Sequence, residues 1–278
     1  MSVIDNQKDL VDWYDNQERV LTKDFLATIR WNQIKNHPVD ESFIPVLIYF
    51  RDVEKFTDIY FQQLAKTPTG RDKVVRQFME KWRHEEDLHG ELMNRFLNEI
   101  GYKTTDDWYE EARRNIPFSN RITRSLSSVV ANLVGTRFTA VHMTWGAINE
   151  MSTLNGYKRL WTLAKHPVLE HILRAIAREE ANHSFFYWSL AKLKLQQSKF
   201  SQQIARYLVD NFWSPVGQGT KPASDTNYVI KKLFDGEEGI NMIDNFVTKR
   251  VGLLPGFEEF KKVTERIAQA TVPQTTTI

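Results

Sequence analysis

Two stretches of this chain combine a helical repeat of apolar residues with the pattern Glu-x-x-His, at Glu86 and His89 and again at Glu180 and His183. Residues three apart in an α-helix rise about 4.5 Å along the axis and project from neighbouring points of one face, so one cation can bind both. The positions that share these faces are mainly apolar: Val75, Met79, Trp82, Gly90, Met93, Leu97 and Ile100 around the first pattern, and Leu169, Leu173, Ile176, Ser184, Tyr187 and Ala191 around the second. Both patterns are therefore predicted to face a protein core, where a charged group needs a partner.

The residues around the two patterns have different expected environments. His84 and His171 project from the opposite sides of their helices, so we expect both to face solvent. Glu85 and Glu179 directly precede the acids of the two patterns, and two interpretations of them stay open. They either support the metal ligands from behind or belong to solvated helix faces.

The helical repeat extends through most of the chain, without a convincing series of alternating strands, and predicts an all-α protein. The expected helical segments are an N-terminal arm to about residue 36, then 42–66, 72–100, 105–115, 120–133, 136–165, 167–197, 200–213 and an interrupted segment at 228–264. We expect residues 1–270 to form one domain with its core bundle at about 42–197, followed by a flexible tail at 271–278.

The composition narrows the possible chemistry. The chain has 278 residues and no cysteine, which excludes disulfides, thiolate zinc sites, iron–sulfur clusters and a cysteine nucleophile. Any bound metal must therefore use His, Asp and Glu. The longest apolar run, Phe43 to Phe50, is far shorter than the roughly 20 residues that span a bilayer, and the first residues lack the apolar region of a signal peptide. We expect a cytoplasmic protein without an integral membrane span, and the net charge of +2 does not indicate a nucleic-acid partner.

Two isolated acids on other long helices complete a possible ligand set. Glu150 lies on an apolar stripe and is the only acid between Ala112 and Leu169. Glu54 lies on the apolar stripe of the helix expected at 42–66, and Asp58, one turn later, is the alternative. We therefore expect six metal ligands: Glu54, Glu86, His89, Glu150, Glu180 and His183. The competing interpretation is two buried Glu–His hydrogen-bonded pairs that are unrelated to the other two acids.

One Glu from each of two helices and Glu-x-x-His from each of two others is the ligand arrangement of ferritin-like di-iron and di-manganese bundles. Four carboxylates balance the charge of two divalent cations while both imidazoles stay neutral, whereas the same carboxylates without cations would repel one another. Oxygen and nitrogen donors without sulfur favour iron or manganese over copper or structural zinc. Iron is the preferred assignment because it changes between ferrous and ferric states and activates O2, with manganese as the second choice.

The segment EEDLHGELMNRFL, from Glu85 to Leu97, resembles the EExxHGxLxNxxL signature of the soluble acyl carrier protein desaturases. REEANH, which ends at His183, matches their second (D/E)ExxH motif, and the order and spacing of the two isolated acids also agree. The resemblance covers residues 42–197 and, more loosely, the whole chain. In that family a Thr three residues after the second isolated Glu borders the oxygen-binding face, and Thr153 matches it. Taken alone, Thr153 would be a helix residue whose hydroxyl bonds to its own backbone.

The resemblance implies a homodimer of ferritin-like four-helix bundles with additional N- and C-terminal helices and two Fe2+ per subunit. Glu86 and Glu180 would bridge the metals, and Thr153 would be catalytic. The implied reaction uses O2 and two electrons from a ferredoxin-type donor to introduce a cis double bond into a fatty acyl chain on acyl carrier protein. Six aromatic residues near the motifs either line an acyl tunnel or pack in the core: Phe50, Phe61, Trp82, Tyr157, Trp161 and Tyr187.

A run of basic residues could contact an acidic carrier protein or simply form a solvated face. It comprises Arg113, Arg114, Arg121, Arg124, Arg137, Lys158, Arg159 and Lys165. The chain departs from the plant-type desaturases inside the second motif, where Ala181 and Asn182 replace two basic residues.

Other di-iron proteins remain as alternatives. An N-oxygenase or a hydroxylase would use the same six ligands. A ribonucleotide reductase small subunit fits less well, because its radical Tyr lies four residues after the first-motif His, where this chain has Met93. A ferritin-like iron store usually ends soon after four helices, whereas this chain continues well beyond the fourth long helix.

Overall fold

A computed structural model describes residues 4–116, 132 and 134–272. Within these residues the fold is all-α, and the only β-type pairing is an isolated bridge between Gln218 and Lys221. In the N-terminal half the helices are α1 Gln7–Asp15, α2 Lys23–Thr28, α3 Ile44–Lys55, α4 Thr57–Leu64, α5 Pro68–Arg71, α6 Lys73–Glu99 and α7 Trp108–Arg114. The remaining helices are α9 Phe138–Ala164, α10 Pro167–Gln196, α11 Lys199–Phe212, α12 Ala223–Phe234, α13 Gly236–Ile243, α14 Lys249–Val251 and α15 Lys262–Thr271.

Short irregular helical turns complete the described chain. They are the 3-10 turns η1 Trp31–Asn36, η2 Glu41–Phe43 and η3 Gly135–Arg137, and the π-helical turn η4 Asp244–Thr248. No helix in the described ranges is both long and apolar enough to cross a bilayer. The prediction of an all-α protein is confirmed.

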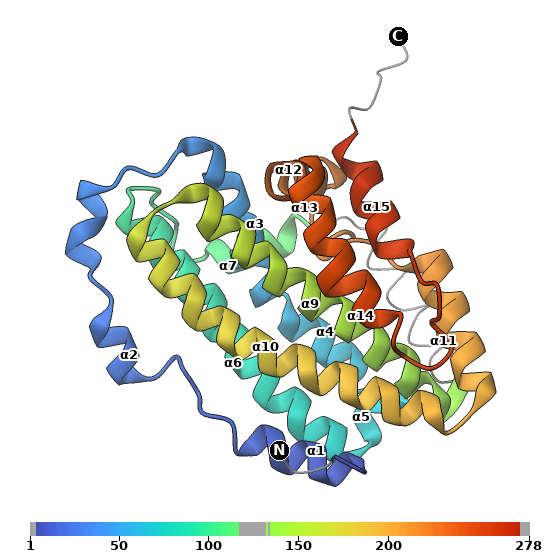
Figure 1. Cartoon of the computed structure of the whole chain (residues 1–278). Helices are drawn as coiled ribbons and strands as arrows, with labels where there is room; N and C mark the ends of the chain where they lie inside the picture. Colours follow the sequence, from blue (N-terminus) through green and yellow to red (C-terminus); the bar gives the residue numbers. More distant parts are fainter. Residues whose placement is uncertain (1–3, 117–131, 133, 273–278) are drawn as a thin grey trace.

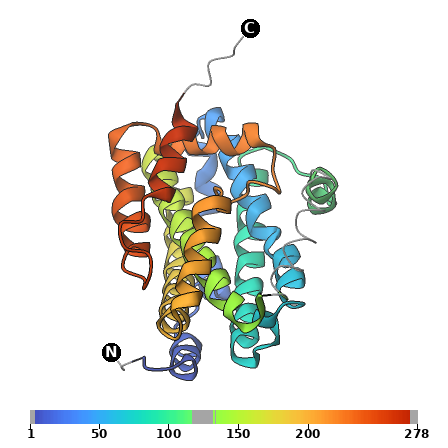
Figure 2. The ribbon, with the colours of Figure 1, turned by 90° about the vertical axis from the view of Figure 1, so that its right-hand side faces the viewer.

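Helices α3, α6, α9 and α10 pack side by side, and they are the elements that carry the candidate ligands (Figures 1 and 2). Within the described chain, α9 with α10 and α3 with α6 form the two most extensive helix pairs. A two-residue turn joins α9 to α10: Lys165 adopts a left-handed conformation with φ of 50°, and His166 Nδ1 accepts the Leu169 amide at 3.1 Å. A turn this short makes the two helices antiparallel neighbours.

The helices outside this group cover two of its sides. Helix α11 packs on α9, and the C-terminal segments α12 to α15 lie over α9 and α3, as the orange and red elements of Figure 1 show. Helix α1 packs against α6 and α10 at the other end of the chain. The apolar faces of the long helices are buried between these layers, so the interior of the four-helix group excludes water.

Several expected boundaries were wrong. The segment 42–66 is two helices, α3 and α4, which meet at the fully buried Phe56. No Gly or Pro marks this break, so the periodic pattern gave no signal for it. The segment 228–264 is interrupted as expected, but its first helix, α12, begins earlier, at Ala223. Of the expected helix at 120–133 only residue 132 is described, and tail residues 273–278 also lie outside the described part.

The close approach of α9 and α10 depends on Gly146, where an added Cβ would overlap the buried ring of Tyr187. We expect Gly146→Ala to lower the free energy of unfolding by about 1–3 kcal/mol, because overpacking costs more than the gain in helix propensity. Urea denaturation followed by circular dichroism measures the change. Thr162→Ala, at an exposed position of the same helix, is the control and should change stability by at most about 0.5 kcal/mol. Equal stabilities of Gly146→Ala and the unmodified protein would show that the helices are not packed this closely.

Candidate metal centre

The four central helices bring the six predicted ligands together in the core. Glu54 comes from α3, Glu150 from α9, and the two Glu-x-x-His pairs come from the middle of α6 and α10. Because α6 and α10 are uninterrupted, each pair keeps its helical spacing of three residues and points in one direction. The exposed fraction of the six residues ranges from 0% to 7%, so all six lie in the protein interior.

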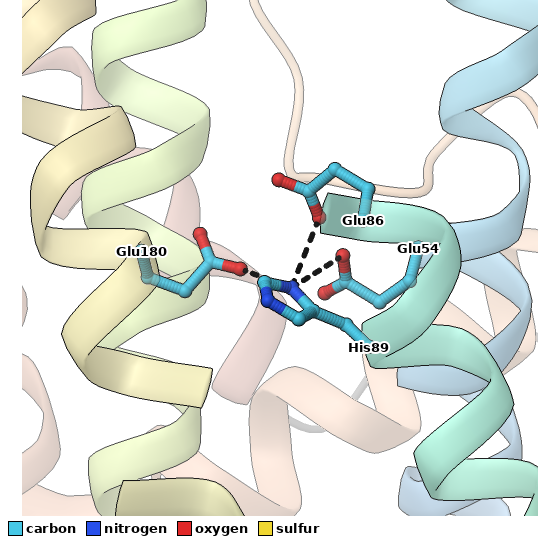
Figure 3. A group of neighbouring side chains, drawn as sticks. All are labelled: Glu54, Glu86, His89 and Glu180. Atoms are coloured by element: carbon cyan, nitrogen blue, oxygen red, sulfur yellow. Dashed lines mark ion pairs between the residues drawn. The ribbon is translucent and has the colours of Figure 1, made fainter. Parts of the chain in front are cut away.

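The first group of possible ligands surrounds His89 (Figure 3). His89 Nδ1 lies 3.1 Å from Glu180 Oε1, 3.4 Å from Glu86 Oε2 and 3.8 Å from Glu54 Oε2. One ligand atom from each of these four residues lies within 4.8 Å of the others. These are distances at which a single cation can contact all four atoms.

The second group surrounds His183. Its Nδ1 atom lies 3.0 Å from Glu86 Oε1, 3.6 Å from Glu150 Oε2 and 3.6 Å from Glu180 Oε2. The ligand atoms of these four residues meet the same 4.8 Å limit. Glu86 and Glu180 belong to both groups and use different oxygen atoms toward the two histidines, which is the geometry of two carboxylates shared by two adjacent cation positions.

Two further acids hold the histidines from the outside, and they do so across the helix pair. Glu179, on α10, accepts a hydrogen bond from His89 Nε2 at 2.9 Å, and Glu85, on α6, accepts one from His183 Nε2 at 2.7 Å. Both acids are buried, so the solvated-face interpretation of these two residues was wrong. The hydrogen bond and charge of the histidine outweigh burial and lower the pKa of each acid, that of Glu179 to about 2. An ionised carboxylate can only accept, so Nε2 carries the proton and Nδ1 is left for a metal.

The acids of the centre divide into two electrostatic classes. Burial and the nearby Glu86 raise the pKa of Glu54 to about 8. Burial and the charge of Glu86 also hold the pKa of Glu150 well above its usual range. Burial opposes ionisation of the two shared acids as well, but a hydrogen bond with Glu54 and contacts with both histidines lower the pKa of Glu86. Contacts with the histidines also lower the pKa of Glu180. Without a cation, protons on the unshared acids therefore limit the repulsion in the cluster.

The histidines respond to the same acidic surroundings. Burial disfavours the imidazolium form of His89, but hydrogen bonding to Glu179 and contact with Glu180 raise its pKa well above the usual value. The pKa of His183 is raised against burial in the same way, by Tyr14 and by its acidic neighbours. Protons on these imidazoles supply positive charge that a divalent cation can replace, since a histidine binds metal only after it loses that proton.

Several inward-facing atoms fit two divalent cations. Among the candidate ligands, five buried atoms have no hydrogen-bond partner: Glu86 Oε1, His89 Nδ1, both carboxylate oxygens of Glu180, and His183 Nδ1. An unsatisfied buried polar atom costs free energy, and native proteins contain few of them. Cations between the shared acids would satisfy all five atoms, and oxygen with imidazole donors suits iron or manganese.

An apolar cavity is lined in part by residues close in sequence to the unshared acids. Its wall includes Val53, which directly precedes Glu54, and Thr153, three residues after Glu150. The rest of the wall comes mainly from α3, α9 and α12, and includes Phe50, Gly156, Ile230 and Leu233. Unlike Ser152, whose hydroxyl donates to the Ile148 carbonyl at 2.7 Å, the Thr153 hydroxyl makes no hydrogen bond within the described residues.

The sequence patterns did not reveal two tyrosines that hydrogen-bond to acids of the centre. Tyr157 donates to Glu54, and Tyr14 donates to Glu85 at 2.5 Å. Of the six aromatics considered for a tunnel, Phe50 lines the cavity. The others make different contacts: Tyr157 with Glu54, Trp82 with Tyr187, Phe61 with Arg83, and Trp161 with Arg174.

His84 and His171 are exposed, as predicted. Arg159 fits neither interpretation of the basic run, since it is buried and pairs with Glu238 at 2.7 Å.

Searches with this chain against protein-family models, curated proteins and solved structures found no match. The function must therefore be inferred from the geometry of this centre and from the resemblance of its motifs to those of the acyl carrier protein desaturases.

Substitution of the shared acids should have a different effect from substitution of the unshared ones. We expect Glu86→Ala or Glu180→Ala to reduce the bound metal from about two ions per chain to fewer than one, because both cation positions lose a ligand. Glu54→Ala and Glu150→Ala should each retain about one ion, because each belongs to one group. Anaerobic loading with Co2+ or Fe2+, desalting and atomic emission spectrometry measure the ratio.

Glu80→Ala, at an exposed acid of α6 that pairs with Arg76 at 3.0 Å, is the control for charge and should bind metal like the unmodified chain. The same metal content in all four ligand variants would contradict the assignment of these groups as metal sites.

Metal affinity should rise with pH. Below its pKa of about 8, Glu54 carries a proton that a cation must displace, and the protonated histidines compete in the same direction. We therefore expect affinity to increase between pH 6 and pH 8, with protons released on binding at pH 7. Chelator competition and a pH indicator in weakly buffered solution measure the two effects. An affinity that stays constant over this range, without proton release, would show that these groups do not bind the metal.

Proposed function

We propose that this protein is a ferritin-like di-iron oxidoreductase, with manganese as the alternative metal, and that it desaturates a fatty acyl chain bound to acyl carrier protein. The observation that carries the proposal is the pair of buried donor groups that share Glu86 and Glu180. Two iron ions, when bound, would supply the redox chemistry with O2 that no side chain of this protein provides. We assign the ligands as Glu54, Glu86, His89, Glu150, Glu180 and His183.

The residues of the centre have separate tasks in this proposal. Glu86 and Glu180, which belong to both groups, would hold both cations, while Glu54 and Glu150 would each complete one position and balance its charge. The Tyr157 hydroxyl donates to Glu54 and fixes the orientation of that carboxylate.

The lining of the cavity is apolar, which suits part of an acyl chain, and its volume of about 50 Å³ means that a whole chain would have to widen it. The wall includes Val53, next to Glu54, and Thr153, three residues after Glu150. A hydrocarbon chain gains free energy in such a site because apolar surface leaves water. The Thr153 hydroxyl would hold or transfer a proton at Oγ1 where the chain approaches the metals, while the surrounding apolar side chains exclude water from the reacting methylenes.

The proposed partners are acyl carrier protein, a ferredoxin-type electron donor, O2 and a second copy of the chain. The exposed Arg114 and Arg137 and the half-buried Arg113 support a contact with an acidic carrier. Arg159 is excluded from that surface by its burial, and Arg121 and Arg124 lie outside the described residues.

Turnover of acyl carrier protein substrates tests the proposal. Iron is loaded without oxygen, and the protein is then given O2, reduced ferredoxin and acyl chains of several lengths, with products identified by mass spectrometry. We expect a cis alkene from at least one chain length and at least about a 100-fold slower rate for Thr153→Ala, because proton transfer is lost.

Ser152→Ala is the matched control, since Ser152 lines the same cavity but its hydroxyl is already bonded to a backbone carbonyl. It should keep the rate within about threefold. Hydroxylated or N-oxygenated products without alkene would contradict desaturation and favour another di-iron oxygenase. Accumulation of iron without turnover of any substrate would favour an iron store.

A further inference from the structure

The segment 14–21, named here the N-terminal strap, leads out of α1 and crosses the outside of the metal centre. Figure 1 shows the blue N-terminal chain passing from α1, which packs on α6 and α10, toward α2. Only Tyr14 and Asp15 of the strap are helical. The strap nevertheless makes direct hydrogen bonds to both acids that orient the histidines.

Two side chains of the strap hold Glu85. The Tyr14 hydroxyl donates to Glu85 Oε2 at 2.5 Å, and Arg19 Nε lies 2.5 Å from Glu85 Oε1. Arg19 is itself fixed by the strap, because its guanidinium donates to the carbonyls of Tyr14 and Gln17 at 3.0 and 2.9 Å and stacks over the Tyr14 ring at 4.4 Å. The position of the Glu85 carboxylate that receives His183 is therefore determined by Tyr14 and Arg19.

Two backbone amides of the strap hold Glu179. Val20 and Leu21 donate their N–H groups to Glu179 Oε1 at 2.7 and 3.0 Å, while the other oxygen accepts His89. Backbone donors cannot be removed by a side-chain substitution. Side-chain substitutions in the strap can therefore release Glu85 while the hydrogen bonds to Glu179 stay in place.

We propose that the N-terminal strap is a positioning element that keeps both histidines with Nδ1 toward the metals, and that Tyr14 and Arg19 are the positioning residues for His183. This inference rests on the proposed metal centre. Groups that orient a metal-binding histidine from behind commonly change its metal affinity when they are altered. Without Tyr14 and Arg19, Glu85 loses every donor except His183, and its carboxylate is no longer held in place toward that histidine.

The double variant Tyr14→Phe/Arg19→Met tests this role. We expect it to bind two Co2+ ions at high concentration, with affinity about 10- to 100-fold weaker for the ion in the Glu150–His183 group. The affinity of the ion in the Glu54–His89 group should change less than about threefold, because the backbone of the strap still holds Glu179. Chelator competition and the visible absorption of bound Co2+ measure both steps, and Glu150→Ala identifies which step belongs to which group.

Three further variants separate positioning from folding. Arg19→Met alone, at a partly exposed residue, should weaken the same step if the double variant does not fold. Arg19→Lys should recover part of the affinity. Arg178→Met is the matched control, because Arg178 approaches Glu18 of the strap at 3.8 Å without contacting either orienting acid, and it should bind both ions normally.

Two results would overturn the role of the strap while leaving the metal centre intact. The first is unchanged affinity for both ions in Tyr14→Phe/Arg19→Met. The second is an equal loss at both steps that follows the fall in melting temperature, as expected for a purely structural contact. Failure of the unmodified chain to bind two ions would instead overturn both the metal centre and the strap.

Discussion

The mutual repulsion of four carboxylates in a dry core is the constraint that organises this protein. Glu54, Glu86, Glu150 and Glu180 are all buried and close together, so each needs a positive charge, a proton or a hydrogen-bond donor. The raised pKa of the two unshared acids and the unsatisfied atoms of the shared acids are two consequences of one cluster. Two divalent cations satisfy both, because they replace the protons and contact the unsatisfied atoms.

The same constraint explains why each histidine pattern begins with two acids. On α6 and α10 the second Glu of the pair faces the cluster, while the first Glu reaches across and holds the histidine of the other helix. Each helix therefore supplies candidate metal ligands and also orients the candidate ligand opposite. These two hydrogen bonds couple the register of α6 to that of α10. The N-terminal strap supplies further donors to the two acids that accept them.

The helical spacing of apolar residues predicted the long helices and their buried faces. It correctly placed α6, α9 and α10 and turned all six candidate ligands inward, because burial at three- and four-residue spacing is visible in a sequence. It could not find the break at Phe56, which has no Gly or Pro. It also could not find the burial of Arg159, which bonds to the Leu233 carbonyl and pairs with Glu238 in a distant segment. The role of the strap could not be predicted from the sequence, because its hydrogen bonds join residues about 70 to 160 positions apart. In addition, every residue except proline has a backbone N–H, so the sequence does not mark which of them donate.

The most direct test of the account is anomalous X-ray diffraction from crystals loaded with iron or manganese. We predict two peaks separated by about 3.5–4 Å, one beside His89 Nδ1 and the other beside His183 Nδ1, with carboxylates from α6 and α10 between them. A single peak, or a metal bound only at the protein surface, would contradict the central claim that this core is built around a metal pair.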